Sequence, residues 1–234
     1  MLQSVMQEIA ETCRHIVSKD WAEASAGNLS CLINSDDQTV CHSTWYDLGY
    51  CLEHLKGRQL LVSGSGTRMR EMQHDPAAGL LIIFISADGR RYAFQQLQNQ
   101  NTGRIKPTSE LLMHLYVHET LLRAQSPDRV VVHAHITDFI LLSHKEPGMN
   151  STMLNDKLRN IHPEMDLIMP EGAGVVPFLA SGSYQLAKET AEVIAEFPVA
   201  VMTKHGGIAT GNNFAIAMDR LELINKLVSI YLRL

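Results

Sequence analysis

Residues 130–138 read Val-Val-Val-His-Ala-His-Ile-Thr-Asp, and the rest of the sequence can be interpreted outward from this stretch. A run of β-branched apolar residues that ends in polar ones is typical of a short buried strand. Side chains repeat with period two along a strand, so we expect His133 and His135 to leave the same face. Two imidazoles at a strand end would form half of a metal site. Taken alone, the pair fits hydrogen-bonded buried histidines about as well as a divalent metal site.

A third histidine strengthens the metal interpretation. His205 directly follows the apolar residues 199–203, which we predict to be a strand, and it precedes Gly206 and Gly207. Glycines at this point let the backbone pass close to another segment. Histidines from two strand ends match a catalytic zinc site that keeps positions open for substrate or water. Six other histidines lie in polar or turn contexts that favour the surface: His42, His54, His74, His118, His144 and His162.

A carboxylate is the second element of the predicted site. Glu110 falls in the first turn of a helix predicted over about 109–124, with Thr108 or Ser109 as its N-cap. An acidic residue at that place commonly does no more than complement the helix dipole. His114 could likewise be only the i+4 neighbour of Glu110. Beside the three histidines, however, Glu110 becomes a candidate acid/base.

Three short segments of small polar residues form the third element. They are 25–28, 63–66 and 108–109, and each leaves or enters a predicted strand or helix. Backbone N–H groups in such loops, together with hydroxyls and a helix N-terminus, bind phosphate without a lysine. Any one of these loops alone is most often just a turn. The sequence contains neither a P-loop nor a dinucleotide-binding fingerprint, so it does not indicate nucleotide binding.

The remaining pattern predicts alternating helices and strands without a repeat or a linker. Helices are expected over 2–18, 45–55, 138–144, 151–160, 184–196 and 213–234. Strands are expected over 29–33, 59–63, 80–86, 90–96, 166–169, 174–178 and 199–203, with a hairpin turn at Asp88-Gly89 and a loop over 102–108. We therefore predict a single domain over 1–234. The fold class is α+β, with helices against a largely antiparallel central sheet.

Composition limits the classes of protein that this chain can belong to. It has 234 residues, of which 45% are hydrophobic and 19% charged, as in ordinary globular proteins. A net charge of −5 and a pI near 6.1 argue against a nucleic-acid partner. The cysteines at 13, 31, 41 and 51 lack C-x-x-C spacing and suit reduced thiols. With no signal-peptide block and no membrane-length apolar run, we expect a cytoplasmic protein without a membrane partner.

Seven segments, taken together and in this order, resemble the class II aldolase/adducin family, with the strongest likeness to its rhamnulose-1-phosphate aldolase branch. They are 27–30 (Gly-Asn-Leu-Ser), 62–66 (Val-Ser-Gly-Ser-Gly), 75–78 (Asp-Pro-Ala-Ala), 107–110 (Pro-Thr-Ser-Glu), 128–135 (Asp-Arg-Val-Val-Val-His-Ala-His), 171–177 (Glu-Gly-Ala-Gly-Val-Val-Pro) and 205–206 (His-Gly). The combination of Pro-Thr-Ser-Glu, Asp-Arg-Val and His-x-His is specific, whereas Gly-Asn-Leu-Ser alone is not.

The resemblance implies an activity and a site. It implies α/β/α layers, a Zn²⁺ ion on His133, His135 and His205, and Glu110 as the acid/base. The implied phosphate site consists of Asn28, Ser65, Gly66, Thr108 and Ser109. The implied reaction is cleavage of a 2-ketose 1-phosphate, L-rhamnulose 1-phosphate in this branch, to dihydroxyacetone phosphate and L-lactaldehyde. Members of the family are homotetramers with sites between subunits.

Two departures and several alternatives accompany the resemblance. The branch tends to carry Asn where Ser25 stands, and this chain ends at Leu234, before the C-terminal tails that lie near the site in relatives. Glu164 falls where the branch has a second useful carboxylate. The same scaffold also supports fuculose-phosphate cleavage, pentulose-phosphate 4-epimerisation and a thio-sugar dehydration. In the adducin head it serves assembly without catalysis, a role that would not need the three histidines together with Glu110.

Overall fold

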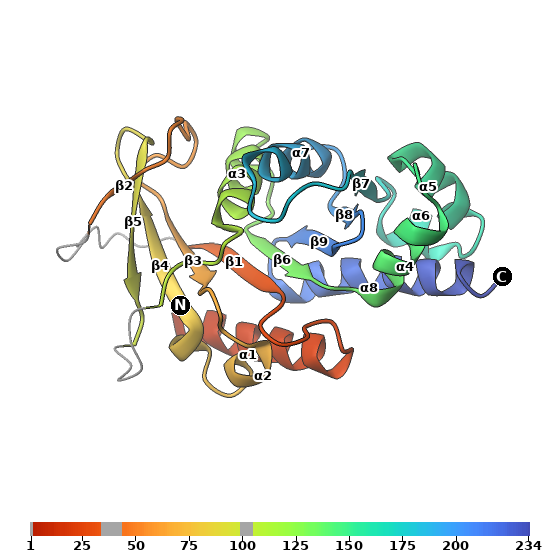
Figure 1. Ribbon diagram of the computed structural model, residues 1–234, viewed down its shortest axis with the longest axis horizontal. Helices are drawn as coiled ribbons and strands as arrows, with labels where there is room; N and C mark the ends of the chain where they lie inside the picture. The colour runs from red at the N-terminus through yellow and green to blue at the C-terminus, as the bar shows by residue number, and fades with distance from the viewer. Residues whose placement is uncertain (1, 34–43, 99–104) are drawn as a thin grey trace.

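A single sheet runs through the molecule (Figure 1). In the computed structural model, which describes residues 2–33, 44–98 and 105–234, it has nine strands in the order β2-β5-β4-β3-β1-β6-β9-β8-β7. The strands are β1 Asn28–Ile33, β2 Tyr46–Asp47, β3 Gln59–Ser63, β4 Leu80–Ile85, β5 Arg91–Gln96, β6 Val130–Ala134, β7 Gly174–Val176, β8 Val199–Met202 and β9 Gly206–Gly211. Neighbouring strands are antiparallel except for the parallel pair β7 and β8. The predicted fold class is thereby confirmed.

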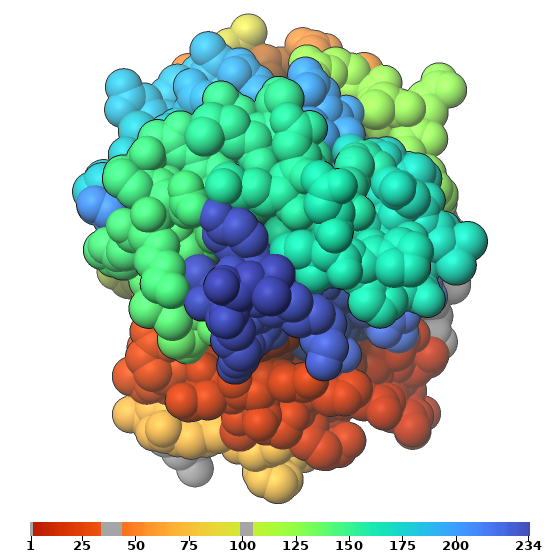
Figure 2. All heavy atoms as spheres, turned by 90° about the vertical axis from the view of Figure 1, so that its right-hand side faces the viewer, coloured from red at the N-terminus to blue at the C-terminus, as the bar shows by residue number. Residues whose placement is uncertain are grey.

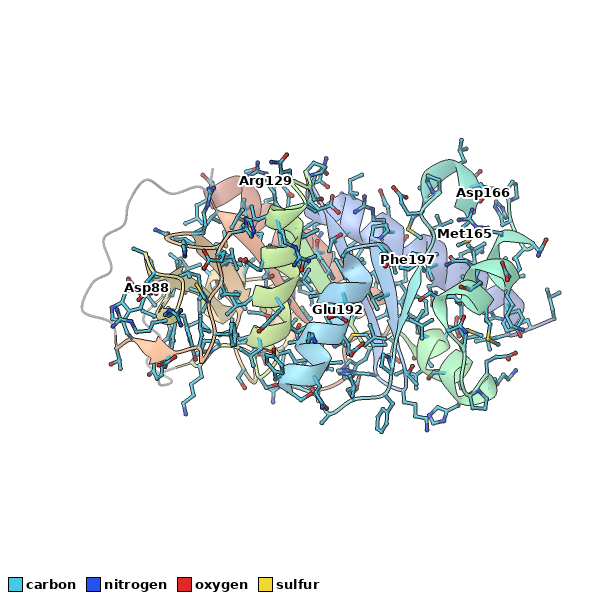
Figure 3. All side chains as sticks on the ribbon, turned by 90° about the horizontal axis from the view of Figure 1, so that it is seen from above. Asp88, Arg129, Met165, Asp166, Glu192 and Phe197 are labelled. Carbon is cyan, nitrogen blue, oxygen red and sulfur yellow. The ribbon has the colours of Figure 1, made fainter. Side chains whose placement is uncertain are left out.

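Helices cover both faces of this sheet. They are α1 Leu2–Ser18, α2 Met69–Met72, α3 Leu111–Arg123, α4 Thr137–Lys145, α5 Ser151–Arg159, α6 Glu164–Ile168, α7 Tyr184–Ile194 and α8 Phe214–Tyr231, with a 3-10 turn at Pro76–Gly79 before β4. In Figure 1, α1, α2 and α8 lie below the sheet and α3 and α7 above it. Figure 3 shows α3 and α7 side by side, with Glu192 of α7 labelled. Figure 2 shows the end of the molecule built by α4, α5 and α6, where the C-terminus of α8 lies between them and α1.

The central strand β6 is buried on both faces, which explains its continuous apolar sequence. Val130 and Val132 belong to the core cluster that contains residues of α1 and α8. Val131 belongs to the cluster that contains residues of α3 and α7. Because faces alternate along a strand, His133 leaves β6 on the Val131 side. His133, the first predicted metal ligand on β6, therefore faces the helix that begins after Glu110.

Two predicted elements are wrong. Segment 45–55, expected to be helical, contains the short strand β2 and turns, because Tyr46 stacks on Tyr92 and Phe94 of β5 at centroid distances of 5.3 and 5.6 Å. Segment 166–169, expected to be a strand, lies largely in α6, where Leu167 and Ile168 are exposed rather than buried. An apolar run indicates a buried strand only if its side chains are covered, and here they are not.

Strand β9 and helix α2 were not predicted. The sequence of β9, Gly-Gly-Ile-Ala-Thr-Gly, lacks the usual strand signal because glycine is depleted in strands. A Cβ atom at Gly207 would lie 2.6 Å from the Phe139 ring, so the glycine is what allows this close packing. Expectations for Cys41, His42 and residues 102–104 lie outside the described residues. Cys13, Cys31 and Cys51 are free thiols, and none of the described helices could span a membrane.

Candidate metal centre and active site

Three histidines meet where β6 ends and where the chain turns from β8 into β9. One ring nitrogen from each of His133, His135 and His205 lies within 4.8 Å of the other two. Their ring centroids are 4.8 to 5.4 Å apart. Pairing of β6 with β9, which sets Ala134 opposite Gly207, brings the two strand ends together. The structure thus places the three predicted histidines in one cluster.

Gly206 permits the close approach of β9 to β6. Its φ of 144° lies in the region that favours glycine. A Cβ atom at this position would lie 2.3 Å from the Ala134 carbonyl oxygen, closer than any side chain could be placed. The glycine predicted to let the backbone pass close to another segment therefore does so, and it carries His205 to the end of β6.

Two of the rings are oriented through their Nδ1 atoms. His133 Nδ1 lies 2.9 Å from the Gly207 carbonyl oxygen, and His135 Nδ1 lies 2.6 Å from Glu23 Oε1. A carbonyl and a carboxylate only accept hydrogen bonds, so Nδ1 carries a hydrogen in both rings, and in the neutral form of each ring Nε2 keeps its lone pair. Imidazole ligands of metals are commonly oriented by such partners.

The Nε2 atom of His133 lacks a hydrogen-bond partner among the described residues, although it is buried. Leaving a buried acceptor unpaired costs about 1–3 kcal/mol. Burial also lowers the pKa of His133, as does Coulombic repulsion from His205, while Glu110 opposes the shift. The pKa of His205 is lowered mainly by burial. Neutral imidazoles with free lone pairs are what a divalent cation requires of its ligands, so this cluster fits a metal ion.

Glu110 lies beside the cluster as a buried carboxylate, 3% exposed. Its Oε2 is 3.4 Å from His133 Nε2 and its Oε1 is 3.6 Å from His205 Nε2. Burial alone would raise the pKa of Glu110. The attraction of His133 and His205, together with hydrogen bonds, outweighs burial and lowers it. Glu110 is the N-cap residue of α3, one or two positions later than the predicted cap.

Two hydrogen bonds hold the Glu110 carboxylate in place. Ser181 Oγ donates to Oε1 at 2.9 Å, and Asn28 Nδ2 donates to Oε2 at 2.8 Å. Sequence reasoning missed Ser181, although it belongs to a small-residue loop, Ala-Ser-Gly-Ser, of the kind recognised elsewhere in the chain. Gly182 in this loop has a φ of 72° and packs so closely on Ser109 that a Cβ atom would lie 2.8 Å from the Ser109 carbonyl oxygen. Glu23 was also missed, and nothing in its polar loop distinguishes it.

The three predicted phosphate loops come together at the ends of β1 and β3. Leu29 N, directly after the first loop, donates to Ser63 Oγ at 3.0 Å, which ties the end of the first loop to the second. Thr108 N donates to the Ser63 carbonyl at 3.1 Å, and Ser65 N donates to that of Lys106 at 2.7 Å, which joins the second to the third. Of the predicted phosphate contacts, Ser65, Gly66 and Ser109 are exposed, whereas Thr108 and Asn28 are buried. The exposed three are accessible to a ligand from solvent.

A second pair of histidines lies inside the molecule on α3. His114 Nε2 is 2.6 Å from Asn28 Oδ1, and its Nδ1 is 2.7 Å from Ser30 Oγ. His118 Nε2 is 2.8 Å from the same hydroxyl. The predicted surface position of His118 is wrong, because Ser30 on β1 gives its ring a buried partner and leaves it 1% exposed. Burial lowers the pKa of both histidines to about 3.

The remaining predicted residues lie apart from the cluster. The expected surface positions of His54, His74, His144 and His162 are confirmed. Glu164 begins α6, and its backbone N–H donates to His162 Nδ1 at 3.2 Å. Within the described residues, no hydrogen bond or ion pair joins Glu164 to the three clustered histidines.

Comparison with known sequences agrees with the family resemblance found in the sequence motifs. A family model described as the class II aldolase and adducin N-terminal domain matches residues 7–232. A rhamnulose-1-phosphate aldolase from Bacteroides thetaiotaomicron is 29% identical, over 99% of this chain and 86% of its own length. A protein of the same name from Listeria welshimeri is 30% identical, over 98% of this chain and 83% of its own length.

Comparison with solved structures supports the same grouping. A sugar-phosphate aldolase from Thermotoga maritima superimposes with a TM-score of 0.83 at 28% identity, covering 99% of this chain and 95% of its own. An L-fuculose-1-phosphate aldolase from Thermus thermophilus has a TM-score of 0.61 at 15% identity, covering 100% of this chain and 95% of its own. At the lower identity, the likeness concerns the fold alone.

Proposed function

Because the chain belongs to the class II aldolase and adducin family, we propose that it is a zinc-dependent aldolase acting on L-rhamnulose 1-phosphate. The products would be dihydroxyacetone phosphate and L-lactaldehyde. The observation that carries this proposal is a buried carboxylate, Glu110, whose oxygens lie 3.4 and 3.6 Å from two histidines of a metal-competent cluster. The choice of substrate is supported by the names of the relatives at 29% and 30% identity.

The three histidines suit zinc by their donor atoms. Zinc accepts imidazole nitrogens, and a catalytic site keeps coordination positions free beyond three protein ligands. His133 and His135 each have Nδ1 engaged by an acceptor, so Nε2 is the atom available to the ion. When bound, a zinc ion supplies an electrophilic charge that stabilises the negative charge left on the ketone fragment.

Glu110 would move the proton at C3. Cleavage breaks the C3–C4 bond, the electron pair stays with C3, and Glu110 delivers a proton to that carbon. In net terms the C4 hydroxyl loses a proton and C3 gains one. In the reverse direction the carboxylate removes a proton from C3 of dihydroxyacetone phosphate. Ser181 and Asn28 fix the carboxylate through hydrogen bonds to Oε1 and Oε2, so its direction relative to the histidines is set before substrate binds.

The phosphate would be bound by the small-residue loops. Gly66 and Ser109 offer backbone N–H groups, Ser65, Thr108 and Ser109 offer hydroxyls, and the loops that contain them are hydrogen-bonded to one another. Asn28 uses one amide hydrogen for Glu110, so its second is the one available to a phosphate oxygen. Binding energy from the phosphate would position the reacting carbons against Glu110 and the histidines.

The proposal includes assembly and location. On the family resemblance, we propose that the chain forms one domain, functions as a cytoplasmic homotetramer, and builds its sites between subunits. Sedimentation equilibrium of the purified protein tests the assembly, because a monomer at micromolar concentration would contradict it.

A substrate screen tests the proposed activity. Zinc-loaded protein is incubated with L-rhamnulose 1-phosphate, L-fuculose 1-phosphate and L-ribulose 5-phosphate, and released dihydroxyacetone phosphate and epimerised product are both measured. We expect the highest kcat/KM for dihydroxyacetone phosphate release from L-rhamnulose 1-phosphate, and release at least about a hundredfold slower from Glu110→Gln. A higher kcat/KM for either of the other sugars would make that sugar the substrate in place of L-rhamnulose 1-phosphate. Absence of turnover with all three would overturn the enzyme assignment in favour of an assembly module.

A further inference from the structure

A continuous chain of buried hydrogen bonds runs from Glu110 into the core. Asn28 Nδ2 meets Glu110 Oε2 at 2.8 Å, and Asn28 Oδ1 meets His114 Nε2 at 2.6 Å. His114 Nδ1 meets Ser30 Oγ at 2.7 Å, and Ser30 Oγ meets His118 Nε2 at 2.8 Å. None of these five residues is more than 7% exposed. Their spacing matches two regular elements. Glu110, His114 and His118 lie four residues apart at the N-cap of α3 and along it, and Asn28 and Ser30 lie on one face of β1.

The Glu110 carboxylate sets the direction of every hydrogen bond in this series. A carboxylate only accepts, so Asn28 must present its NH₂ group to Glu110 and its oxygen to His114. That oxygen requires a hydrogen on His114 Nε2, which leaves Nδ1 of the neutral ring as an acceptor. Ser30 must then donate its single hydrogen to His114. Its oxygen can only accept from His118, which must also carry its hydrogen on Nε2.

We propose that His114 is a positioning residue for Glu110, that it acts through the Asn28 amide, and that Ser30 and His118 fix its tautomer. This inference rests on the proposed function, in which Glu110 moves the proton. If the side-chain amide of Asn28 rotated by about 180°, its oxygen would face the Glu110 carboxylate, and two hydrogen-bond acceptors would oppose each other. The N–H of His114 prevents that rotation because it needs the amide oxygen. Ser181 holds the other carboxylate oxygen separately.

The tautomers give a test that does not depend on any substrate. The full-length protein is labelled with ¹⁵N-histidine, and ring nitrogen shifts are recorded near neutral pH. We expect His114 and His118 to carry hydrogen on Nε2. Loss of single signals in His114→Gln and His118→Gln assigns them, and exposed His144→Gln serves as the matched control. A hydrogen on Nδ1 of His114 in the wild type would overturn the inference, whatever the enzyme's activity proves to be.

Kinetics test the consequence for Glu110. His114→Phe keeps a ring in the site but removes both nitrogens, so we expect kcat to fall about tenfold to a hundredfold, as expected when a buried polar partner is lost. Zinc content should change by less than about twofold, and the KM for the phosphorylated ketose should rise less than in Asn28→Ala, because the Asn28 amide itself is retained. His114→Gln, which retains an N–H donor, should recover part of the lost kcat.

A purely structural role predicts a different pattern. Both variants would melt at a lower temperature, yet kcat measured well below melting would be unchanged and equal in the two. That pattern would overturn the positioning role. If the wild type has no aldolase activity, the proposed function fails, and the nitrogen shifts still decide whether the hydrogen-bond chain has the stated direction.

Discussion

The molecule contains two groups of histidines, and a comparison of one buried member of each is instructive. His133 and His114 are both 0% exposed, and burial lowers the pKa of each. Both nitrogens of His114 have partners within the protein, Asn28 and Ser30. His133 uses Nδ1 for a carbonyl oxygen, and its Nε2 has no hydrogen-bond partner among the described residues. Hydrogen bonding at Nε2 among the described residues, not burial, therefore distinguishes His133, a proposed metal ligand, from His114.

The two groups also differ in how the chain builds them. His114 and His118 come from adjacent turns of one helix, and their partners Asn28 and Ser30 come from one strand. The three histidines of the metal cluster come from a strand end and a turn about seventy residues away in sequence. A site joined from separate segments can be left open toward a ligand, whereas a helix packed on a strand closes over its polar groups. Four predictions test this contrast.

Removing a histidine from the cluster of His133, His135 and His205, the open group, should have the largest effect. We expect His205→Ala to lose most of its zinc and nearly all aldolase activity, because two imidazoles bind zinc far more weakly than three. Elemental analysis of the purified variant measures the loss. His118→Gln, from the closed group of His114 and His118, should keep about one zinc per chain. Full retention of metal in His205→Ala would refute the three-histidine site.

Removing the proposed acid/base, Glu110, should lower turnover without loss of metal. Glu110→Gln keeps the shape of the side chain and its place at the start of α3 but has no transferable proton. We expect kcat to fall about a hundredfold to ten-thousandfold. If Glu110 only complemented the helix dipole, stability would change by well under about 1 kcal/mol and turnover would be near normal.

Proton exchange isolates the step that we propose for Glu110. In heavy water, with no aldehyde present, the wild type should exchange the C3 proton of dihydroxyacetone phosphate, and Glu110→Gln should not. Zinc content and melting temperature are recorded on the same samples, so lost exchange cannot be attributed to lost metal or unfolding. Exchange at the wild-type rate in the variant would assign the base to another group.

Asn28 links Glu110 to His114, and its removal should affect both kcat and KM. Asn28→Ala takes one hydrogen bond from Glu110 and one from His114. We expect KM for the phosphorylated ketose to rise about tenfold to a hundredfold and kcat to fall about tenfold. Ser65→Ala, which leaves Glu110 untouched, should raise KM alone. An unchanged KM in Asn28→Ala would place the phosphate elsewhere.

The closed group should make the protein sensitive to acid. The pKa of His114 and His118 is about 3 in the folded state, against about 6.5 in an unfolded chain. Below pH 6.5 the unfolded chain binds more protons, so stability that is fully present above that pH is lost as pH falls toward 3. The loss is at most about 1.4 kcal/mol per pH unit for each histidine.

Urea unfolding at pH 7 and pH 5 measures this sensitivity. His118→Gln removes one of the two buried titrating rings, so its free energy of unfolding should depend less steeply on pH than that of the wild type. The difference between the two proteins over this range should be about 1–2 kcal/mol. Equal losses in both would show that His118 does not contribute to the acid sensitivity.

The sequence by itself indicated the parts of the site whose residue types are chemically specific. Histidines that follow an apolar strand, a carboxylate after Pro-Thr-Ser, and loops of glycine and serine each have ordinary roles when taken alone. Their combination, with the family resemblance that it carries, predicted their convergence. The antiparallel α+β fold also followed, because strand periodicity and an Asp-Gly hairpin are local features. The burial of β6 was likewise apparent from its unbroken apolar run.

Only the tertiary structure decided which polar atoms are paired and which are not. Ser181 lies 71 residues from Glu110 along the chain, Glu23 lies 112 from His135, and His118 is buried by a serine 88 residues away. Periodicity reports only which face of an element a residue occupies, not what a distant segment brings to that face. A nitrogen left without a partner is a property of the packed molecule, because it depends on every segment that could have reached it.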